Sequence, residues 1–166
     1  NGLLTLIDIP RPVISTANFA LLLEDIQDPG NLGSILRSAG AAGCDAVYLS
    51  PGCADAWSPR VLRAAMGGHF SIAINESCDI LEIASRFEGR LLAASLQASA
   101  TLYECDLRGR LAFAIGNEGA GLSPVLQACA SQRFIIPMPG GVESLNAAAA
   151  TAVCLFEAVR QRGTSR

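Results

Sequence analysis

The chain has 166 residues, of which 51% are hydrophobic and only 5% aromatic, and its formal net charge is −3. This length fits one domain, and a core of Ala, Leu, Ile and Val suits close packing of helices on a sheet. All 12 basic residues are arginines, which excludes Schiff-base chemistry and a P-loop lysine. The negative charge argues against a protein that coats nucleic acid through bulk electrostatics, so such contacts must be local, lie in a dimer groove or come from another domain.

Six cysteines are spread along the sequence without a CxxC pair, and His69 is the only histidine. This spacing argues against zinc, and a chain of this size needs no disulfides, so we expect free thiols in a reducing cytoplasm and no metal. The sequence does not open on an export signal, and its longest apolar run near the C-terminus is too short to span a bilayer. The first residue is Asn1 rather than Met, so we expect a piece of a longer protein.

Short apolar strands and helices alternate along the chain. Strands buried on both faces read as continuous apolar runs, and helices follow capping residues or Ser-Pro pairs. The predicted order is strand 19–23, helix 32–42, strand 46–49, helix 59–66, strand 71–74, helix 80–87, strand 91–94, strand 111–115, helix 124–130, strand 134–136 and helix 145–162.

This alternation with short connections predicts an α/β fold with a parallel sheet of about six strands flanked by helices. We expect residues 19–166 to form one domain, and residues 1–18 to be a linker or entry segment. No internal repeat or low-complexity segment suggests a further division.

The stretch from Phe134 to Arg162 combines a strand, a loop with two Pro and two Gly, and a long helix. Pro and Gly fix the course of the loop, and we predict that Ser144 caps the helix. A rigid loop before a helix start makes a cradle with exposed backbone donors for a small molecule, although an ordinary connection is the alternative. The small residues from Ala147 to Ala150 would let the helix approach a neighbour closely, or it packs only on its own sheet.

A glycine-rich stretch, Gly116 to Leu122, follows a predicted strand and precedes a helix, which is where α/β folds place ligands. The third glycine of a dinucleotide fingerprint is absent, which disfavours a nucleotide-binding Rossmann protein. The glycines still imply close approach of the backbone to something. Glu118 between them is an orienting acceptor or a plain turn residue.

A second polar cluster joins Asn31 and Arg37, which lie nearly two helical turns apart and can share a face. Asn31 could also simply cap the helix. Arg37 stands among apolar residues, and because arginine is seldom buried unless paired, we expect it to need a partner. The acidic residues Glu24, Asp25 and Asp28 are interpreted as a solvated turn rather than a metal site.

His69 has no nucleophile motif beside it and is interpreted as a loop histidine. Trp57 is interpreted as a packing residue or a lid.

Three motifs in a fixed order resemble motifs 1, 2 and 3 of the SpoU (TrmH) family of S-adenosylmethionine-dependent RNA 2′-O-ribose methyltransferases, of the SPOUT class. The resemblance covers residues 21 to 162. The motifs are Asn31-x-x-x-x-x-Arg37-Ser38-Ala39, then Ile115-Gly116-Asn117-Glu118-Gly119-x-Gly121-Leu122, then Ile136-Pro137-Met138 followed by Glu143-Ser144-Leu145-Asn146.

The resemblance implies a deep C-terminal trefoil knot, whose loops would bind S-adenosylmethionine mainly through backbone, and a dimer built by the helix after Asn146. It also implies that residues 1–18 follow a small N-terminal RNA-binding domain. The implied cofactor contacts are Gly116, Ile136 and Leu145, with Ala94, Ser95, Leu96, Met138, Ser144 and Asn146 around them. The implied catalytic or substrate-positioning residues are Arg37, Asn31, Glu118, Ser144 and Asn146.

The resemblance therefore leads us to expect a cytoplasmic homodimer that methylates a ribose 2′-OH of tRNA or rRNA. Arg37 would bind the neighbouring phosphate and polarise the hydroxyl, because arginine stays protonated and is poorly suited to act as a base. Methylation of a base is the alternative reaction, which Arg37 together with Asn31 disfavours. A non-catalytic RNA-binding protein of the same fold is the other alternative, which the intact motifs disfavour.

Overall fold

The computed structural model describes residues 2, 8–9, 17–117 and 119–163. Most of the predicted linker, residues 1–18, lies outside the described residues, and so does Glu118. The elements are β1 (Phe19–Leu23), α1 (Pro29–Ala42), β2 (Ala46–Leu49), α2 (Pro59–Ala65), the 3₁₀ helix η1 (Gly68–Phe70), β3 (Ala73–Asn75), α3 (Ile80–Arg86), β4 (Arg90–Ala94), the 3₁₀ helix η2 (Leu102–Glu104), β5 (Leu111–Ile115), α4 (Pro124–Cys129), β6 (Gln132–Phe134) and α5 (Ala147–Arg162).

The strands form one six-stranded sheet in the order β3-β2-β1-β5-β4-β6, and every neighbouring pair is parallel. This confirms the predicted parallel α/β architecture. The trefoil knot implied by the resemblance stays a prediction. Within the described residues, no helix combines the length and apolarity that crossing a membrane requires.

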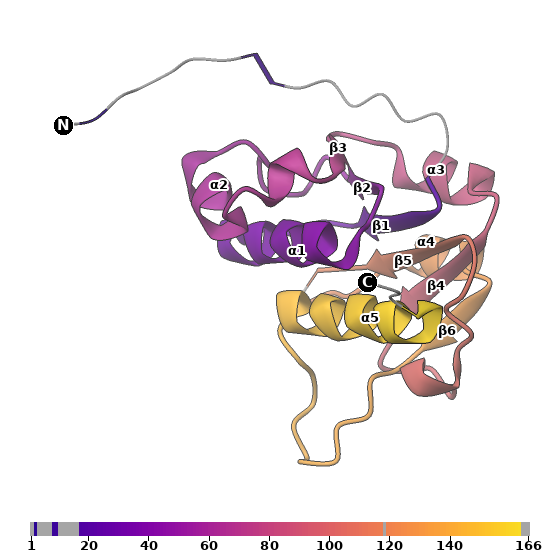
Figure 1. Ribbon diagram of the computed structural model, residues 1–166. Coiled ribbons are helices and arrows are strands. Elements are labelled where there is room, and N and C mark those ends of the chain that lie inside the picture. Colours follow the sequence, from indigo (N-terminus) through magenta and orange to yellow (C-terminus); the bar gives the residue numbers. More distant parts are fainter. Residues whose placement is uncertain (1, 3–7, 10–16, 118, 164–166) are drawn as a thin grey trace.

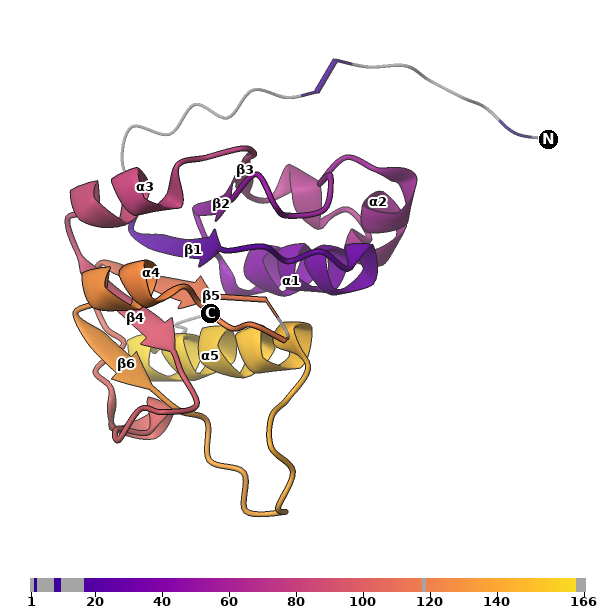
Figure 2. The same cartoon turned by 180° about the vertical axis from the view of Figure 1, so that it is seen from behind.

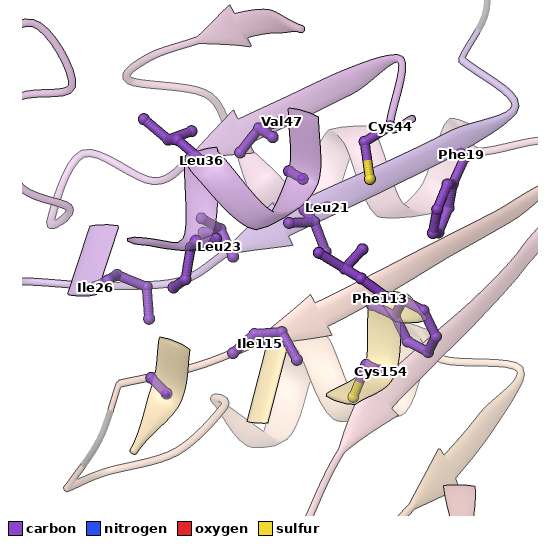
Figure 3. Packing of buried hydrophobic residues seen from close by; sticks show 14 of the residues in the cluster. Phe19, Leu21, Leu23, Ile26, Leu36, Cys44, Val47, Phe113, Ile115 and Cys154 are labelled. Atoms are coloured by element: carbon purple, nitrogen blue, oxygen red, sulfur yellow. The ribbon is translucent and has the colours of Figure 1, made fainter. Parts of the chain in front are cut away.

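The two faces of the sheet are covered by different helices (Figures 1 and 2). Side chains alternate along β1, so Phe19, Leu21 and Leu23 pack in one core cluster, while Ala20 and Leu22 pack in the other. The first cluster includes buried residues of α1, α2 and α5, and the second those of α3 and α4. Figure 3 shows the first cluster.

Helices α1 and α5 lie side by side on the first face, and α2 packs against α1 beyond them (Figure 1). A Cβ atom on Gly33 of α1 would lie 2.5 Å from the Cβ of Ala64 and 2.7 Å from the carbonyl oxygen of Val61, both in α2. Only glycine permits this approach, so Gly33 sets the distance between the two helices.

Two strand predictions were misplaced. The sixth strand is Gln132–Phe134 rather than 134–136, because beyond Phe134 the sheet pairing with β4 stops and Ile135 bridges Thr101 instead. The third strand is Ala73–Asn75 rather than 71–74, because the amide of Ser71 donates to the carbonyl of Gly68 and closes η1.

All six cysteines are free thiols. Burial raises the pKa of Cys44 to about 12 and also raises the pKa of Cys154 in α5, so both core thiols stay protonated.

Candidate functional site

The loops that follow β4, β5 and β6 lie together at the carboxyl ends of these strands, because the strands are parallel and adjacent in the sheet. Together with the start of α5 they enclose a cavity of about 300 Å³. Its walls are formed by Ala94, Ser95, Leu96, Gln97, Ile115, Gly116, Asn117, Gly119, Ala120, Gly121, Leu122, Gln127, Phe134, Ile135, Ile136, Met138, Ser144, Leu145, Ala147 and Ala150.

Eight of the nine predicted cofactor contacts line this cavity, namely Gly116, Ile136, Leu145, Ala94, Ser95, Leu96, Met138 and Ser144. Asn146 does not line it. The walls described contain no ionisable side chain, so they offer backbone groups, the amides of Gln97, Asn117 and Gln127, and the hydroxyls of Ser95 and Ser144. Such groups can hold and orient a small molecule through hydrogen bonds.

The loop after β5 folds back on itself at Gly116. A Cβ atom there would lie 2.3 Å from the carbonyl carbon and oxygen of Gly121, so no larger residue fits. Gly121 has φ +70°, in the left-handed region that glycine tolerates, and its amide donates to the carbonyl of Asn117 over 2.8 Å.

Asn117, which was not among the predicted site residues, organises this loop. Its Oδ1 accepts from the amides of Gly119, at 2.8 Å, and Ala120, at 3.0 Å. Its Nδ2 donates to the carbonyl oxygen of Asp25 at 3.0 Å, which ties the loop to the end of β1. Its role could have been predicted from its position directly before a glycine-rich turn, because Asn side chains often form hydrogen bonds to the backbone about two residues ahead of them.

The helix α5 is capped by Asn146, and the prediction that Ser144 caps it was wrong. The Oδ1 of Asn146 accepts from the amides of Ala148, at 2.9 Å, and Ala149, at 3.2 Å. Both residues are good capping types, but the helix begins at Ala147, which places Asn146 at the capping position. Ser144 is exposed and turns to the cavity wall instead.

The same Asn146 side chain brings two predicted catalytic residues together. Its Nδ2 donates to the Oδ1 of Asn31 at 2.7 Å, although the two residues lie 115 positions apart. Asn31 is not the cap of α1, because the carboxylate of Asp28 accepts from the Asn31 amide at 2.8 Å. The Oδ1 of Asn31 is therefore bonded to Asn146 rather than capping its own helix.

Arg37 lies on the exposed side of α1 and does not line the cavity. The buried face of α1 consists of Leu32, Gly33, Ile35, Leu36 and Ala39, so the expectation that Arg37 needs a partner because it is buried was wrong. Within the part of the chain that the structure describes, its guanidinium forms no ion pair or hydrogen bond.

The three acids near β1 have separate partners. Glu24 accepts from the amide and hydroxyl of Ser123 at the start of α4, and Asp25 accepts from the hydroxyl of Ser50. Asp28 caps α1. Among the described residues, no group of three or more His, Cys, Asp or Glu side chains could hold a metal ion.

His69 was wrongly interpreted as a loop histidine. It lies in η1 with 5% of its surface exposed, and its Nε2 is 2.6 Å from the carbonyl oxygen of Ala56. Its ring packs against that of Trp57, with centroids 4.9 Å apart, which makes Trp57 a packing residue.

The capping contact yields a stability test. We expect Asn146→Ala to lower the free energy of unfolding by about 1 kcal/mol, because two amides of α5 lose their acceptor. The control Ser144→Ala should change it by less than about 0.5 kcal/mol, because Ser144 is exposed and caps nothing. Urea unfolding of both variants measures the difference. A larger loss in Ser144→Ala than in Asn146→Ala would contradict the assignment of the cap.

Comparison with known proteins places this site in a family. The model of the SpoU rRNA Methylase family matches residues 18–156. The 23S rRNA (guanosine(2553)-2′-O)-methyltransferase RlmP of Bacillus subtilis is 38% identical over 152 residues, which cover 89% of this chain and 60% of that protein. The chain spans between 54 and 65% of the length of the curated relatives it matches.

Solved structures agree with this match. The SpoU methyltransferase AviRb of Streptomyces viridochromogenes, in complex with AdoMet, has a TM-score of 0.78 and 31% identity over 90% of this chain and 62% of its own. A structure that describes 2-OH methylation of C/U34 on tRNA has a TM-score of 0.74 and 32% identity, over 86% of this chain and 95% of its own. The chain therefore belongs to the SpoU rRNA methylase family.

Proposed function

We propose that this chain is the catalytic domain of an RNA 2′-O-methyltransferase that uses S-adenosylmethionine to methylate a ribose 2′-OH of tRNA or rRNA. The observation that carries the proposal is the cavity itself, whose walls contain eight predicted cofactor contacts and which lies beside the hydrogen-bonded pair Asn31 and Asn146. RlmP of B. subtilis is named for this reaction on guanosine of 23S rRNA, and AviRb was solved with AdoMet.

The cavity fits S-adenosylmethionine in size and in chemistry. About 300 Å³ lies at the lower end of the volumes of small-molecule sites, and the uncharged walls suit a ligand held largely through backbone groups. The fold of the loop at Gly116 leaves main-chain groups facing the cavity where any side chain would clash. Bound there, the cofactor supplies an electrophilic methyl group.

Catalysis by this chain is then a matter of positioning. Arg37 would bind the phosphate beside the target ribose and polarise the 2′-OH. Its oxygen would take the methyl group as the C–S bond of the sulfonium breaks and a thioether leaves, and its proton would pass to solvent. Asn31, held by Asn146, and the hydroxyl of Ser144 position the ribose. We retain Glu118 as a further substrate-positioning residue.

We also propose that the chain acts as a homodimer in the cytoplasm. Helix α5 exposes Phe156, with 48% of its surface accessible, and carries small residues along its first turns. A twofold interface would cover this apolar surface with its own copy.

Free thiols suit a reducing compartment. Residues 1–18 then link this domain to a preceding RNA-binding domain.

Cofactor binding is tested with Leu145→Arg. Leu145 is half-buried in the cavity wall, so an arginine there fills the cavity and places a charge among uncharged groups. We expect more than about a 100-fold loss of affinity for S-adenosylmethionine in calorimetry. The control Val142→Arg, in the same loop but 60% exposed and outside the cavity wall, should bind like wild type. Absence of binding to folded wild-type protein would overturn the proposed function.

The role of Arg37 is tested by substitution in the full-length protein. Because Arg37 is exposed, Arg37→Ala should leave the fold and cofactor affinity intact while methyl transfer to RNA falls about 100-fold. Arg37→Lys should restore little, since lysine lacks the planar fork that can hold a phosphate and a hydroxyl together. The measurement is transfer of a labelled methyl group, and near-normal transfer by Arg37→Ala would remove this residue from the mechanism.

Dimerisation is tested by light scattering at micromolar protein concentration. We expect a mass of two chains for the wild type and a shift toward one chain for Phe156→Glu, because the charge would lie in an apolar interface. A wild-type mass of one chain would contradict the homodimer.

A further inference from the structure

The arginines of the chain differ in how their charges are compensated. Five of the ten within the described residues form ion pairs: Arg86, Arg90, Arg108, Arg110 and Arg160. Arg162 donates to the carbonyls of Leu107 and Gly109 and covers the ring of Phe19. The remaining four have no ion pair or hydrogen bond inside the described part of the chain, and they are Arg37, Arg60, Arg63 and Arg133.

Three of these four arginines lie on the adjacent helices α1 and α2 (Figure 1). Arg60 is one helical turn before Ala64, the residue that meets Gly33 of α1, and Arg63 is three residues after Arg60. Residues four apart share a helix face, so Arg60 lies on the flank of α2 that bears Ala64, and Arg63, three residues after Arg60, is its neighbour on the exposed surface of the same helix.

The chain after α2 continues this surface to Arg37. A Cβ atom on Gly68 would lie 3.0 Å from the Cα of Arg37, so η1 rests directly on α1 at that residue. Arg37, Arg60 and Arg63, together with Phe70 at the end of η1, are called the α1–α2 arginine surface below.

Phe70 is exposed but held in place. Three quarters of its surface, 75%, is accessible, although its neighbour His69 is buried against Trp57 and bonded to Ala56. Met66 and Gly67 both have positive φ, 48° and 86°, and turn the chain sharply out of α2. The amide of Phe70 donates to the carbonyl of Gly67 at 3.1 Å. An exposed ring on an anchored turn can stack with a base at little cost in conformational entropy.

We propose that the α1–α2 arginine surface binds a single-stranded segment of the RNA substrate that flanks the target nucleotide. Arg60 and Arg63 bind phosphates of this segment, Phe70 stacks on one of its bases, and the segment leads to Arg37. The inference rests on the proposed function for the identity of the ligand as RNA. It deepens that function by naming where the substrate strand runs outside the cavity.

Charge complementarity favours RNA over a protein as the occupant. The chain carries a net charge of −3, so attraction of a polyanion depends on local groups whose charge is not already compensated. Three exposed arginines without ion pairs among the described residues, on α1 and α2, and an exposed aromatic ring on η1, which rests on α1, supply both requirements of single-strand binding, a basic track and a stacking platform.

The test measures binding of a short fluorescein-labelled single-stranded RNA of mixed sequence by anisotropy, between about 50 and 200 mM salt. The double variant Arg60→Gln with Arg63→Gln should bind about ten-fold more weakly at low salt. The slope of its log association constant against log salt concentration should be less steep by about 1.4. Each phosphate contact on a single strand contributes about 0.7 to this slope, and two contacts are lost. Phe70→Ala should also bind about ten-fold more weakly, but with the wild-type salt slope.

The matched control is Arg86→Gln with Arg133→Gln, which removes the same two charges elsewhere. Arg86 lies on α3, across the sheet, and Arg133 on β6, at the opposite sheet edge. This control should bind RNA within two-fold of wild type. Equal losses of RNA affinity in both double variants would show that only the overall charge matters, and would overturn the proposal. Wild-type RNA binding by Arg60→Gln with Arg63→Gln would overturn it too. So would a wild-type protein that shows no measurable RNA binding.

Two further measurements separate this inference from the proposed function. In calorimetry, the same variants should bind S-adenosylmethionine with wild-type affinity. If the wild type binds RNA through this surface but does not bind the cofactor, the proposed function is overturned and the inference stands. Light scattering should give the same mass for wild type and for Arg60→Gln with Arg63→Gln. A change in mass would identify the surface as a protein interface and overturn the inference.

Discussion

The site depends on the two ends of one side-chain amide. The Oδ1 of Asn146 accepts two amides at the start of α5, and its Nδ2 donates to Asn31 near the start of α1. A carboxylate could replace the first contact but not the second, and a serine could not reach both. This contact fixes the start of α5 relative to the start of α1 on the same face of the sheet. It thereby also fixes the position of Ala147, the first residue of α5, in the cavity wall.

The proposed mechanism separates cofactor binding physically from the chemistry on the substrate. The cavity walls are uncharged within the described residues, whereas Arg37 lies outside them on the surface of α1. A pocket without fixed charges holds its ligand through main-chain and amide groups whose strength hardly depends on salt. In the proposed mechanism the charge that acts on the substrate comes from Arg37, which has no ion pair among the described residues, so its guanidinium can bind a phosphate without first breaking an internal contact.

Much of the fold could be predicted from the sequence, because β1, β2 and β5 are continuous apolar runs and a buried parallel strand has no other requirement. The same rule failed at Ile135 and Ile136, which are apolar because they line a cavity rather than a sheet. Ser144 and Asn146 are both capping residues, and local chemistry does not choose between them. The cavity residues themselves came from the family resemblance, since no spacing rule joins Ala94 to Met138. Helical periodicity could have predicted that Arg37 is exposed, because the buried stripe of α1 excludes it. That stripe consists of Leu32, Ile35, Leu36 and Ala39.

The order of strands in the sheet has a consequence for how the chain is made. β1 pairs on one side with β2, which follows it closely, but on the other side with β5, so that Phe19 lies opposite Leu111. During synthesis β1 therefore keeps one unpaired edge until most of the domain has left the ribosome, and the loops of the cavity cannot close before then. Pairings between distant segments form slowly and leave apolar strands exposed meanwhile. The nascent chain is thus most vulnerable to aggregation in the interval between translation of α1 and translation of β5.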